Sequence, residues 1–262
     1  MMADTNLNEV CKEAVCIDAG RVYDSCCDRD CLEDLRCYFS EENQQLISTA
    51  VNVRLKNAEV LNVNIDVEQV NFNKGFYCCE LTFFFLIDLD VYTNGNTLPT
   101  DVKGICCYNK RVILFGGVGN AKIFTSVTAL DEVDAQLGAG TNLPRCVVQA
   151  VDPVPLSAKI RRVDNENDVV CGIPDSIAEI IGSNIAINLP DDSNTVYVTL
   201  GLFTVIQLIR NTQMLIPVYD FCIPEKHCDD QCSPVTPCDV FSRIEFPTND
   251  FFPTTINENC EC

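Results

Sequence analysis

Two cysteine-rich stretches near the ends of the chain share one residue pattern. The first, VYDSCCDRDCLEDLRC, covers residues 22–37, and the second, VYDFCIPEKHCDDQCSPVTPC, covers residues 218–238. Both contain V-Y-D-x-C, then C-D-x-x-C, then a last cysteine after five residues, and the second copy inserts IPEKH between its two halves. Thiols in such a pattern could bind a soft metal, serve as nucleophiles or form disulfides.

Metal binding is the first of these chemistries. Zinc sites use pairs of C-x2-C or C-x4-C knuckles, whereas both patterns here have C-x3-C followed by C-x5-C. Cys228, Cys232, Cys238 and His227 could together supply four ligands, so a metal-binding module stays an alternative. The spacing favours neither a resident metal nor a cofactor, and we predict none.

Catalysis by a Ser-His or Cys-His pair would depend on His227, the single histidine of the chain. Such a pair needs a base held in fixed geometry, and His227 falls in a proline-containing, cysteine-dense loop. The G-G-V-G run at 116–119 lacks the spacing and the lysine of a phosphate-binding loop and predicts a turn. Asp88 and Asp90 fall on one strand face, toward solvent. We therefore predict no catalytic residues and no enzyme.

The number of cysteines favours disulfides. The chain has 18 Cys among 262 residues, in three groups of six. Cytosolic proteins rarely keep disulfides, so many cysteines in that compartment more often indicate metal binding; the exception is a protein that is oxidised after deposition in a larger structure. Cys79 falls on an apolar strand face and is interpreted as a small buried hydrophobic residue. The cross-link candidates are Cys11, Cys16, Cys26, Cys27, Cys31, Cys37, Cys78, Cys106, Cys107, Cys222, Cys228, Cys232, Cys238, Cys260 and Cys262.

Three vicinal cysteine pairs, at 26–27, 78–79 and 106–107, add a geometric argument. Neighbouring residues of a strand point to opposite faces, so each pair sends one thiol inward and one outward. A hairpin of 77–91 and 104–115 would place the second and third pairs at opposite ends, too far apart to bridge. The outward thiols are therefore available to another element or another subunit.

Composition limits the functional class. Hydrophobic residues make up 47% of the chain, which is enough for a real core. The formal net charge is −20, and the 18 basic residues are spread out, which excludes nucleic-acid binding. The N-terminal residues lack a basic region followed by an apolar run, so we predict no signal peptide. Apolar runs such as LTFFFLIDLDV are too short for membrane insertion.

Alternation of apolar and polar residues predicts a mainly β fold. It occurs over 51–55 and 61–67, and over 77–91 every odd residue is apolar. TNGN at 93–96 predicts a turn before the strand at 104–115. A second hairpin is predicted from 195–209 and 214–222, with its turn at 210–212.

Short helices and four segments complete the predicted organisation. One helix is expected within 30–45, capped by Asp30, and another at 174–181, ended by Gly182. We expect an antiparallel β-sandwich-like body, of one or two β units, with cysteine-rich arms at both ends. The predicted boundaries are 1–47 for the N-terminal arm, 48–130 for the first β unit, 131–221 for a connection and the second β unit, and 222–262 for the C-terminal arm.

The stretches VCIDAGRVYDSCCDRDCLEDLRCYF (15–39) and VNIDVEQVNFNKGFYCCELTFFFLIDLDVY (63–92) resemble proteins of Clostridium-type endospore formers. With its cysteine content, the chain resembles their cysteine-rich exosporium and spore-coat proteins, which assemble into disulfide-cross-linked lattices. The resemblance implies a self-assembling structural protein of the spore surface, whose partners are itself and other spore-surface proteins. It also implies synthesis in the mother-cell cytosol and oxidation when the spore is released. A soluble ligand-binding β protein is the remaining alternative.

Overall fold

The described part of the chain folds into a mainly antiparallel β structure with two short helices, which confirms the predicted fold class. The computed structural model describes residues 13–93, 98–123, 140–163, 171–182, 184–187, 189–190 and 193–218. The chain divides into two compact units. The larger is Ala19–Thr212, and the smaller comprises Met1–Asp18 and Gln213–Cys262, of which the described residues are all strand. The larger unit crosses the boundary that the sequence suggested near residue 130.

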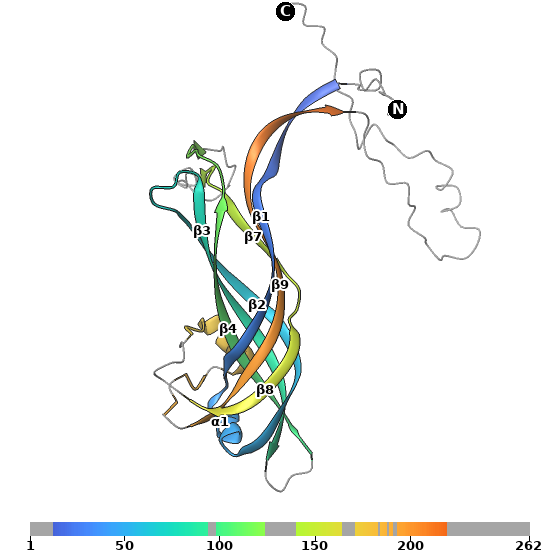
Figure 1. Ribbon diagram of the computed structural model, residues 1–262, viewed down its shortest axis with the longest axis vertical. Coiled ribbons are helices and arrows are strands. Elements are labelled where there is room, and N and C mark those ends of the chain that lie inside the picture. Colours follow the sequence, from blue (N-terminus) through green and yellow to red (C-terminus); the bar gives the residue numbers. More distant parts are fainter. Residues whose placement is uncertain are drawn as a thin grey trace, which may run out of the picture. The chain divides into compact units, whose positions relative to one another are not determined.

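One sheet of seven strands dominates the fold (Figure 1). Its strand order is β2-β3-β4-β1-β9-β7, and β8 also pairs with β9. The strands are β1 (Glu13–Tyr38), β2 (Ala50–Gln69), β3 (Phe76–Thr93), β4 (Thr100–Phe115), β7 (Arg145–Ala150), β8 (Val154–Arg162) and β9 (Asn194–Val218). The other elements are the separate pair β5 (Lys122–Ile123) and β6 (Gly140–Thr141), and the helices α1 (Glu41–Ser48) and α2 (Asp175–Ile181).

The two edges of this sheet approach each other. β8 pairs with residues 194–201 of β9 and β7 with residues 204–209, so the two short strands together form one interrupted edge. β2 forms the opposite edge, and its Val60 N–H donates to the Asp152 carboxylate, between β7 and β8, at 3.0 Å. The strongly twisted sheet therefore curls around a single main core (Figure 1).

β3 supplies the centre of that core. Its odd residues from Leu81 to Leu89 are almost fully buried, which confirms the apolar face predicted from the alternation. The even face is covered as well, because Phe84 packs in a second cluster with Cys171 and Ile177 of the segment that contains α2. Both faces of β3 are thus buried at its middle, and the run FFF at 83–85 meets this requirement.

β2 joins the two predicted alternating stretches into one strand. Its pairing with β3 shifts register at the start of the strand, between Ala50 and Asn52, and twice more, between Leu55 and Asn57 and between Val60 and Asn62; the last two shifts lie between the predicted stretches. Each bulge moves the inward face by one residue. The inward positions are therefore odd at Val53, even at Ala58 and Val60, and odd again after the second bulge. Two bulges restore the original phase, which is why both stretches show the same alternation.

Two expectations at the ends of the sheet were wrong. The helix expected within 30–45 is strand up to Tyr38, and α1 begins only at Glu41, where the Ser40 hydroxyl accepts from the Asn43 N–H at 3.4 Å. The turn expected at 210–212 is absent, because β9 runs unbroken to Val218. Arg210 is buried there and donates from Nη2 to the Gly119 carbonyl at 2.8 Å, an interaction that needs tertiary partners.

Several predicted elements are confirmed, and others were missed or lie outside the described residues. The strands predicted at 77–91 and 104–115 are confirmed as β3 and β4, and the helix predicted at 174–181 is confirmed as α2, which ends at Gly182 with φ 110°. Sequence reasoning missed β7 and β8; the residues of β7 fall within the stretch expected to connect two β units. The TNGN turn (apart from Thr93, which ends β3) and the C-terminal arm at 222–262 lie outside the described residues.

β1 is an inner strand, between β4 and β9, so residues 19–38 of the predicted N-terminal arm are part of the sheet of the larger unit. Its backbone pairing with β4 is limited to Cys37↔Cys106 and Tyr38↔Ile105. Farther along the two strands, side chains make the connection: Lys110 contacts two carboxylates of β1, and the Phe115 N–H donates to Asp24 at 2.9 Å. We call this part, residues 24–30 of β1 opposite 110–115 of β4, the β1–β4 seam.

Candidate functional site: thiols on both faces of the sheet

The vicinal pairs of β3 and β4 divide their thiols between the two faces of the sheet, as the sequence predicted. Cys79 and Cys106 belong to the main core, whereas Cys107 packs in the second cluster and Cys78 in neither. The hairpin register places Cys79 opposite Val112 and Cys106 opposite Phe85, which confirms that the two pairs are too far apart to bridge each other.

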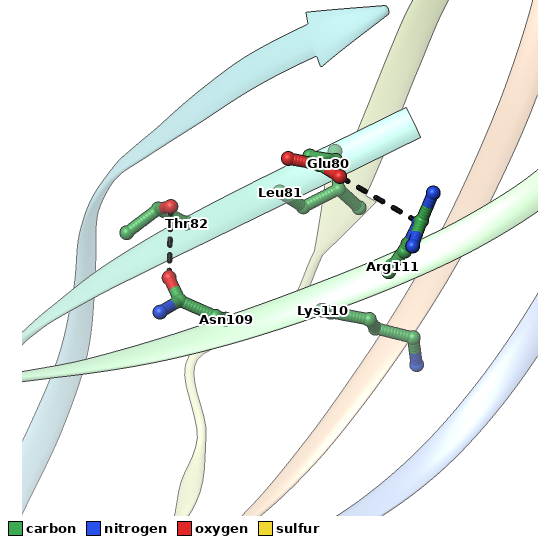
Figure 2. Close-up of a pocket in the computed structure, with 6 residues that line it drawn as sticks. All are labelled: Glu80, Leu81, Thr82, Asn109, Lys110 and Arg111. Carbon is green, nitrogen blue, oxygen red and sulfur yellow. Dashed lines mark hydrogen bonds and ion pairs between the residues drawn. The ribbon is translucent and has the colours of Figure 1, made fainter. Parts of the chain in front are cut away.

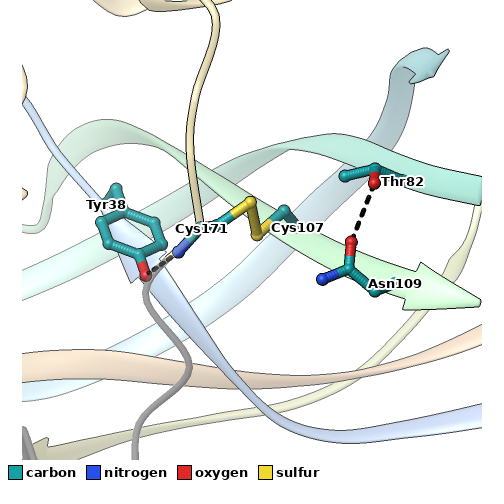
Figure 3. Close-up of a disulfide and its surroundings, with 5 residues drawn as sticks. All are labelled: Tyr38, Thr82, Cys107, Asn109 and Cys171. Carbon is teal, nitrogen blue, oxygen red and sulfur yellow. Dashed lines mark hydrogen bonds between the residues drawn. A yellow bond between two sulfur atoms is a disulfide. The ribbon is translucent and has the colours of Figure 1, made fainter.

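The outward thiol of β4 forms a disulfide. Cys107 is bonded to Cys171 with an S–S distance of 2.10 Å and a Cα–Cα distance of 6.5 Å (Figure 3). The N–H of Cys171 donates to the Tyr38 hydroxyl at 3.1 Å, so the bond fastens the segment before α2 to the outside of the sheet. Cys107 was a cross-link candidate and Cys171 was not. The available signal was the outward direction of Cys107, which required a partner on another element.

The outward thiol of β3 has a polar neighbour. Arg111 Nε donates to Cys78 Sγ at 2.8 Å and lies 3.5 Å from the Glu80 carboxylate. Glu80 and Arg111, but not Cys78, border an open depression of about 380 Å³ on the outer surface, where the Thr82 hydroxyl donates to Asn109 at 2.9 Å (Figure 2). Glu80 is paired with Arg111 and Thr82 with Asn109, and the lining contains no thiol.

Two further thiol pairs lie inside the curled sheet. Cys37 and Cys106 are direct partners in the β1–β4 ladder, and both are buried. Burial and a hydrogen bond with Cys37 raise the pKa of Cys106. A hydrogen bond between Cys79 of β3 and Cys146 of β7 raises the pKa of Cys79 and lowers that of Cys146. Sequence reasoning had treated Cys79 as packing only and had not singled out Cys146.

The first cysteine pattern is divided between the two faces of β1. Cys27 and Cys31 are exposed, whereas Cys26 packs against the core with its pKa raised by desolvation. Cys37, also a cross-link candidate, is buried. The reason is Asp34, whose φ of 54° interrupts the alternation of inward and outward side chains along β1. Even-numbered Leu32 points inward before this residue, and odd-numbered Cys37 points inward after it.

Cys16, in the smaller unit, is also exposed. The second cysteine pattern from Tyr219 onward, Cys11 and the other candidates of the C-terminal arm lie outside the described residues, as does His227. Within the described part of the chain, no group of three or more His, Cys, Asp or Glu side chains is arranged to hold a metal ion. The same residues include no helix long and apolar enough to cross a membrane.

The chemistry that this arrangement offers is thiol oxidation, with one disulfide formed on the outer face, thiol pairs inside and unpaired thiols exposed on β1. No protein-family model, curated protein or solved structure matches the chain.

Proposed function

We propose that the protein is a structural, self-assembling component of the spore surface whose copies are cross-linked by disulfides through Cys27 and Cys31. The observation that carries the proposal is the placement of these two thiols. Both are exposed on one face of β1, four residues apart. Four residues of strand span about 13 Å, whereas bridged cysteines have Cα atoms at most about 7 Å apart. The two thiols therefore cannot bond to each other, and each needs a partner elsewhere.

The surface around these thiols suits contact with a second copy. Arg29 lies between them on the same face, with its guanidinium carbon 5.3 Å from the centre of the Phe203 ring of β9. Phe203, Val154 and Leu156 are exposed apolar side chains on β9 and β8, and the latter two border Gly201. Apolar side chains beside reactive thiols would hold two copies together while a bond forms.

The net charge of −20 opposes this contact at low ionic strength. Self-association then depends on salt or on cations that screen the repulsion, which suits assembly at a chosen time and place. The spore location is supported by the resemblance of residues 15–39 and 63–92 to cysteine-rich spore-surface proteins.

The test is electrophoresis and electron microscopy of purified protein after air oxidation, with and without reductant. We expect a ladder of species that survives boiling in SDS and collapses to about 29.1 kDa with reductant. The double variant Cys27→Ser/Cys31→Ser should lose most of the ladder, whereas Cys16→Ser, which removes one exposed thiol of the smaller unit, should keep it. A wild-type protein that stays monomeric under oxidation would reject the proposal.

The location needs its own experiment. Antibodies against the protein should label the surface of intact spores of the organism that encodes it, and extraction from the spores should require reductant. Labelling confined to the cytosol of vegetative cells would contradict the spore-surface location. It would leave the proposed self-assembly through disulfides unaffected.

A further inference from the structure

The inward thiols of the two vicinal pairs each contact one further thiol. Cys106 lies directly opposite Cys37 in the antiparallel pairing of β4 with β1, and both are at most 1% exposed. Cys79 is fully buried and hydrogen-bonded to Cys146, which packs against the same core. The four sulfurs are unbonded in the structure. Each of the two vicinal motifs thus contributes one inward thiol that contacts a thiol of another strand.

We propose that Cys37–Cys106 and Cys79–Cys146 are sites of intramolecular disulfide formation inside the curled sheet, with a peroxide as the oxidant. Neither pair contains the thiols of the proposed assembly surface, so this inference does not depend on the proposed function.

The geometry of the first pair follows from its register. Directly opposite residues of antiparallel strands have Cα atoms about 4.5–5.5 Å apart, within the range of about 4.4–6.8 Å that disulfides span. This bond would join β1 to β4 at the only place where these strands are paired through their backbones within the described residues. It would therefore fix the end of the β1–β4 seam.

The second pair has a different geometry. β3 and β7 are not neighbours, because β4, β1 and β9 separate them in the strand order. Their thiols meet only because the sheet curls on itself. A Cys79–Cys146 bond would therefore cross the core and hold the two halves of the sheet together covalently.

The chemistry calls for a small, neutral oxidant, because Cys37, Cys79 and Cys106 are buried and exclude molecules of the size of oxidised glutathione. Cys146 is only half-buried, whereas Cys79 is fully buried, so the peroxide reaches Cys146 first and Cys146 is the group that attacks. Its thiolate displaces hydroxide from hydrogen peroxide and becomes a sulfenic acid. The sulfur of Cys79 then attacks the sulfenic sulfur, the S–O bond breaks, and the Cys79 proton ends in water. Two thiols and one peroxide thus give one disulfide and two waters.

The experiment separates buried from exposed thiols by labelling. Reduced, folded protein is treated first with stoichiometric hydrogen peroxide, because Cys146 is only half-buried and would otherwise be alkylated, and then with iodoacetamide to block the remaining exposed thiols such as Cys16, Cys27 and Cys31. After denaturation the remaining thiols are labelled with N-ethylmaleimide, and cross-linked peptides are mapped by mass spectrometry. The Cys107–Cys171 peptide from a parallel sample that has not been reduced serves as the positive control for the mapping, since that disulfide is present in the structure.

We expect Cys37–Cys106 and Cys79–Cys146 peptides and a rise in Tm of about 5 °C or more over the reduced protein. Cys146→Ala should abolish only the second peptide and leave Cys79 labelled, while Cys37→Ala should abolish only the first. Cys78→Ala, on the other face, should change neither. Maleimide on all four cysteines of folded, peroxide-treated protein would overturn the inference, as would their pairing with other cysteines. Since each variant keeps one intact pair, failure of one to fold leaves the other as the test.

Discussion

Lys110 of β4 places its Nζ 2.7 Å from Oδ2 of Asp28 on β1, in a part of the sheet where the two strands have no backbone pairing. The same Nζ also contacts the carboxylate of Asp30. The lysine side chain is only 8% exposed, and it lies on the core side because its cross-strand partner is the buried Leu81. Ion pairs thus replace ladder hydrogen bonds along the β1–β4 seam.

Replacing this lysine should weaken the fold. Lys110→Met keeps the aliphatic stem but leaves two acidic groups, one of them mostly buried, without their cation. We expect a loss of about 1–3 kcal/mol in the free energy of unfolding, measured by urea denaturation. Lys103→Met is the matched control, since Lys103 is exposed and 3.9 Å from Asp88, and it should cost less than about 0.5 kcal/mol. Equal losses in both variants would contradict the role of the seam.

The seam should also depend on pH. Two hydrogen bonds lower the pKa of Asp28. The one from Lys110 has the larger effect, and the one from the backbone N–H of Arg29 has the smaller effect. A carboxyl group with a lowered pKa in the folded state stabilises that state fully above its ordinary pKa and loses the effect as pH falls below about 4.

The measurement is the difference in unfolding free energy between the wild type and Asp28→Asn at pH 6 and pH 3. We expect the wild type to have the larger free energy of unfolding at pH 6, and the two proteins to have similar free energies of unfolding at pH 3. A difference that stays constant between these pH values would show that Asp28 is not held ionised by its neighbours.

The sequence was informative where local pattern decides the structure. The odd residues of β3, the Gly182 end of α2 and the opposite directions of Cys78 and Cys79 all follow from periodicity and backbone preference. It failed where distant segments decide. Arg210 sits in a sequence that favours a turn, yet β9 continues because this side chain is buried against Tyr77 and Gly119.

The thiol partners illustrate the same limit. Register along one hairpin excluded a bond between the Cys78–Cys79 and Cys106–Cys107 pairs, but it could not supply the actual partners. Cys146 reaches Cys79 only through the curl of the sheet, and Cys37 turns inward only through the change of phase at Asp34. Neither the curl of the sheet nor the backbone conformation of Asp34 can be predicted from the local alternation of apolar and polar residues.

A close approach at Gly104 gives a packing test. A Cβ atom there would lie 2.5 Å from Cε1 of Phe39, a ring with no exposed surface. Gly104→Ala should therefore displace the ring and cost about 1–3 kcal/mol in thermal or urea unfolding. Gly172→Ala is the control, because nothing lies within 4 Å of its added methyl group. A neutral Gly104→Ala variant would mean that Phe39 can move without loss.

The outer disulfide should contribute to stability as well. Cys171→Ala removes a bond that closes a loop between residues 64 apart in sequence, and such bonds stabilise by about 2–4 kcal/mol. We expect a loss of that size under non-reducing conditions and a much smaller effect when both proteins are reduced. Cys31→Ala, which removes an exposed free thiol, should be close to neutral in either condition. An equal loss for Cys171→Ala with and without reductant would assign the effect to packing alone.

Ionic strength should control self-association. Raising salt from about 10 mM to about 150 mM shortens the screening length from about 30 Å to about 8 Å, which weakens repulsion between copies that each carry a net charge of −20. We expect light scattering under oxidising conditions to grow faster at the higher salt concentration. Phe203→Ser, which removes an exposed ring beside Arg29, should slow this growth at both concentrations, whereas Phe72→Ser, which removes an exposed ring just beyond the end of β2, should not. Growth that is independent of salt, or equally slowed by both variants, would place the contact between copies on another surface.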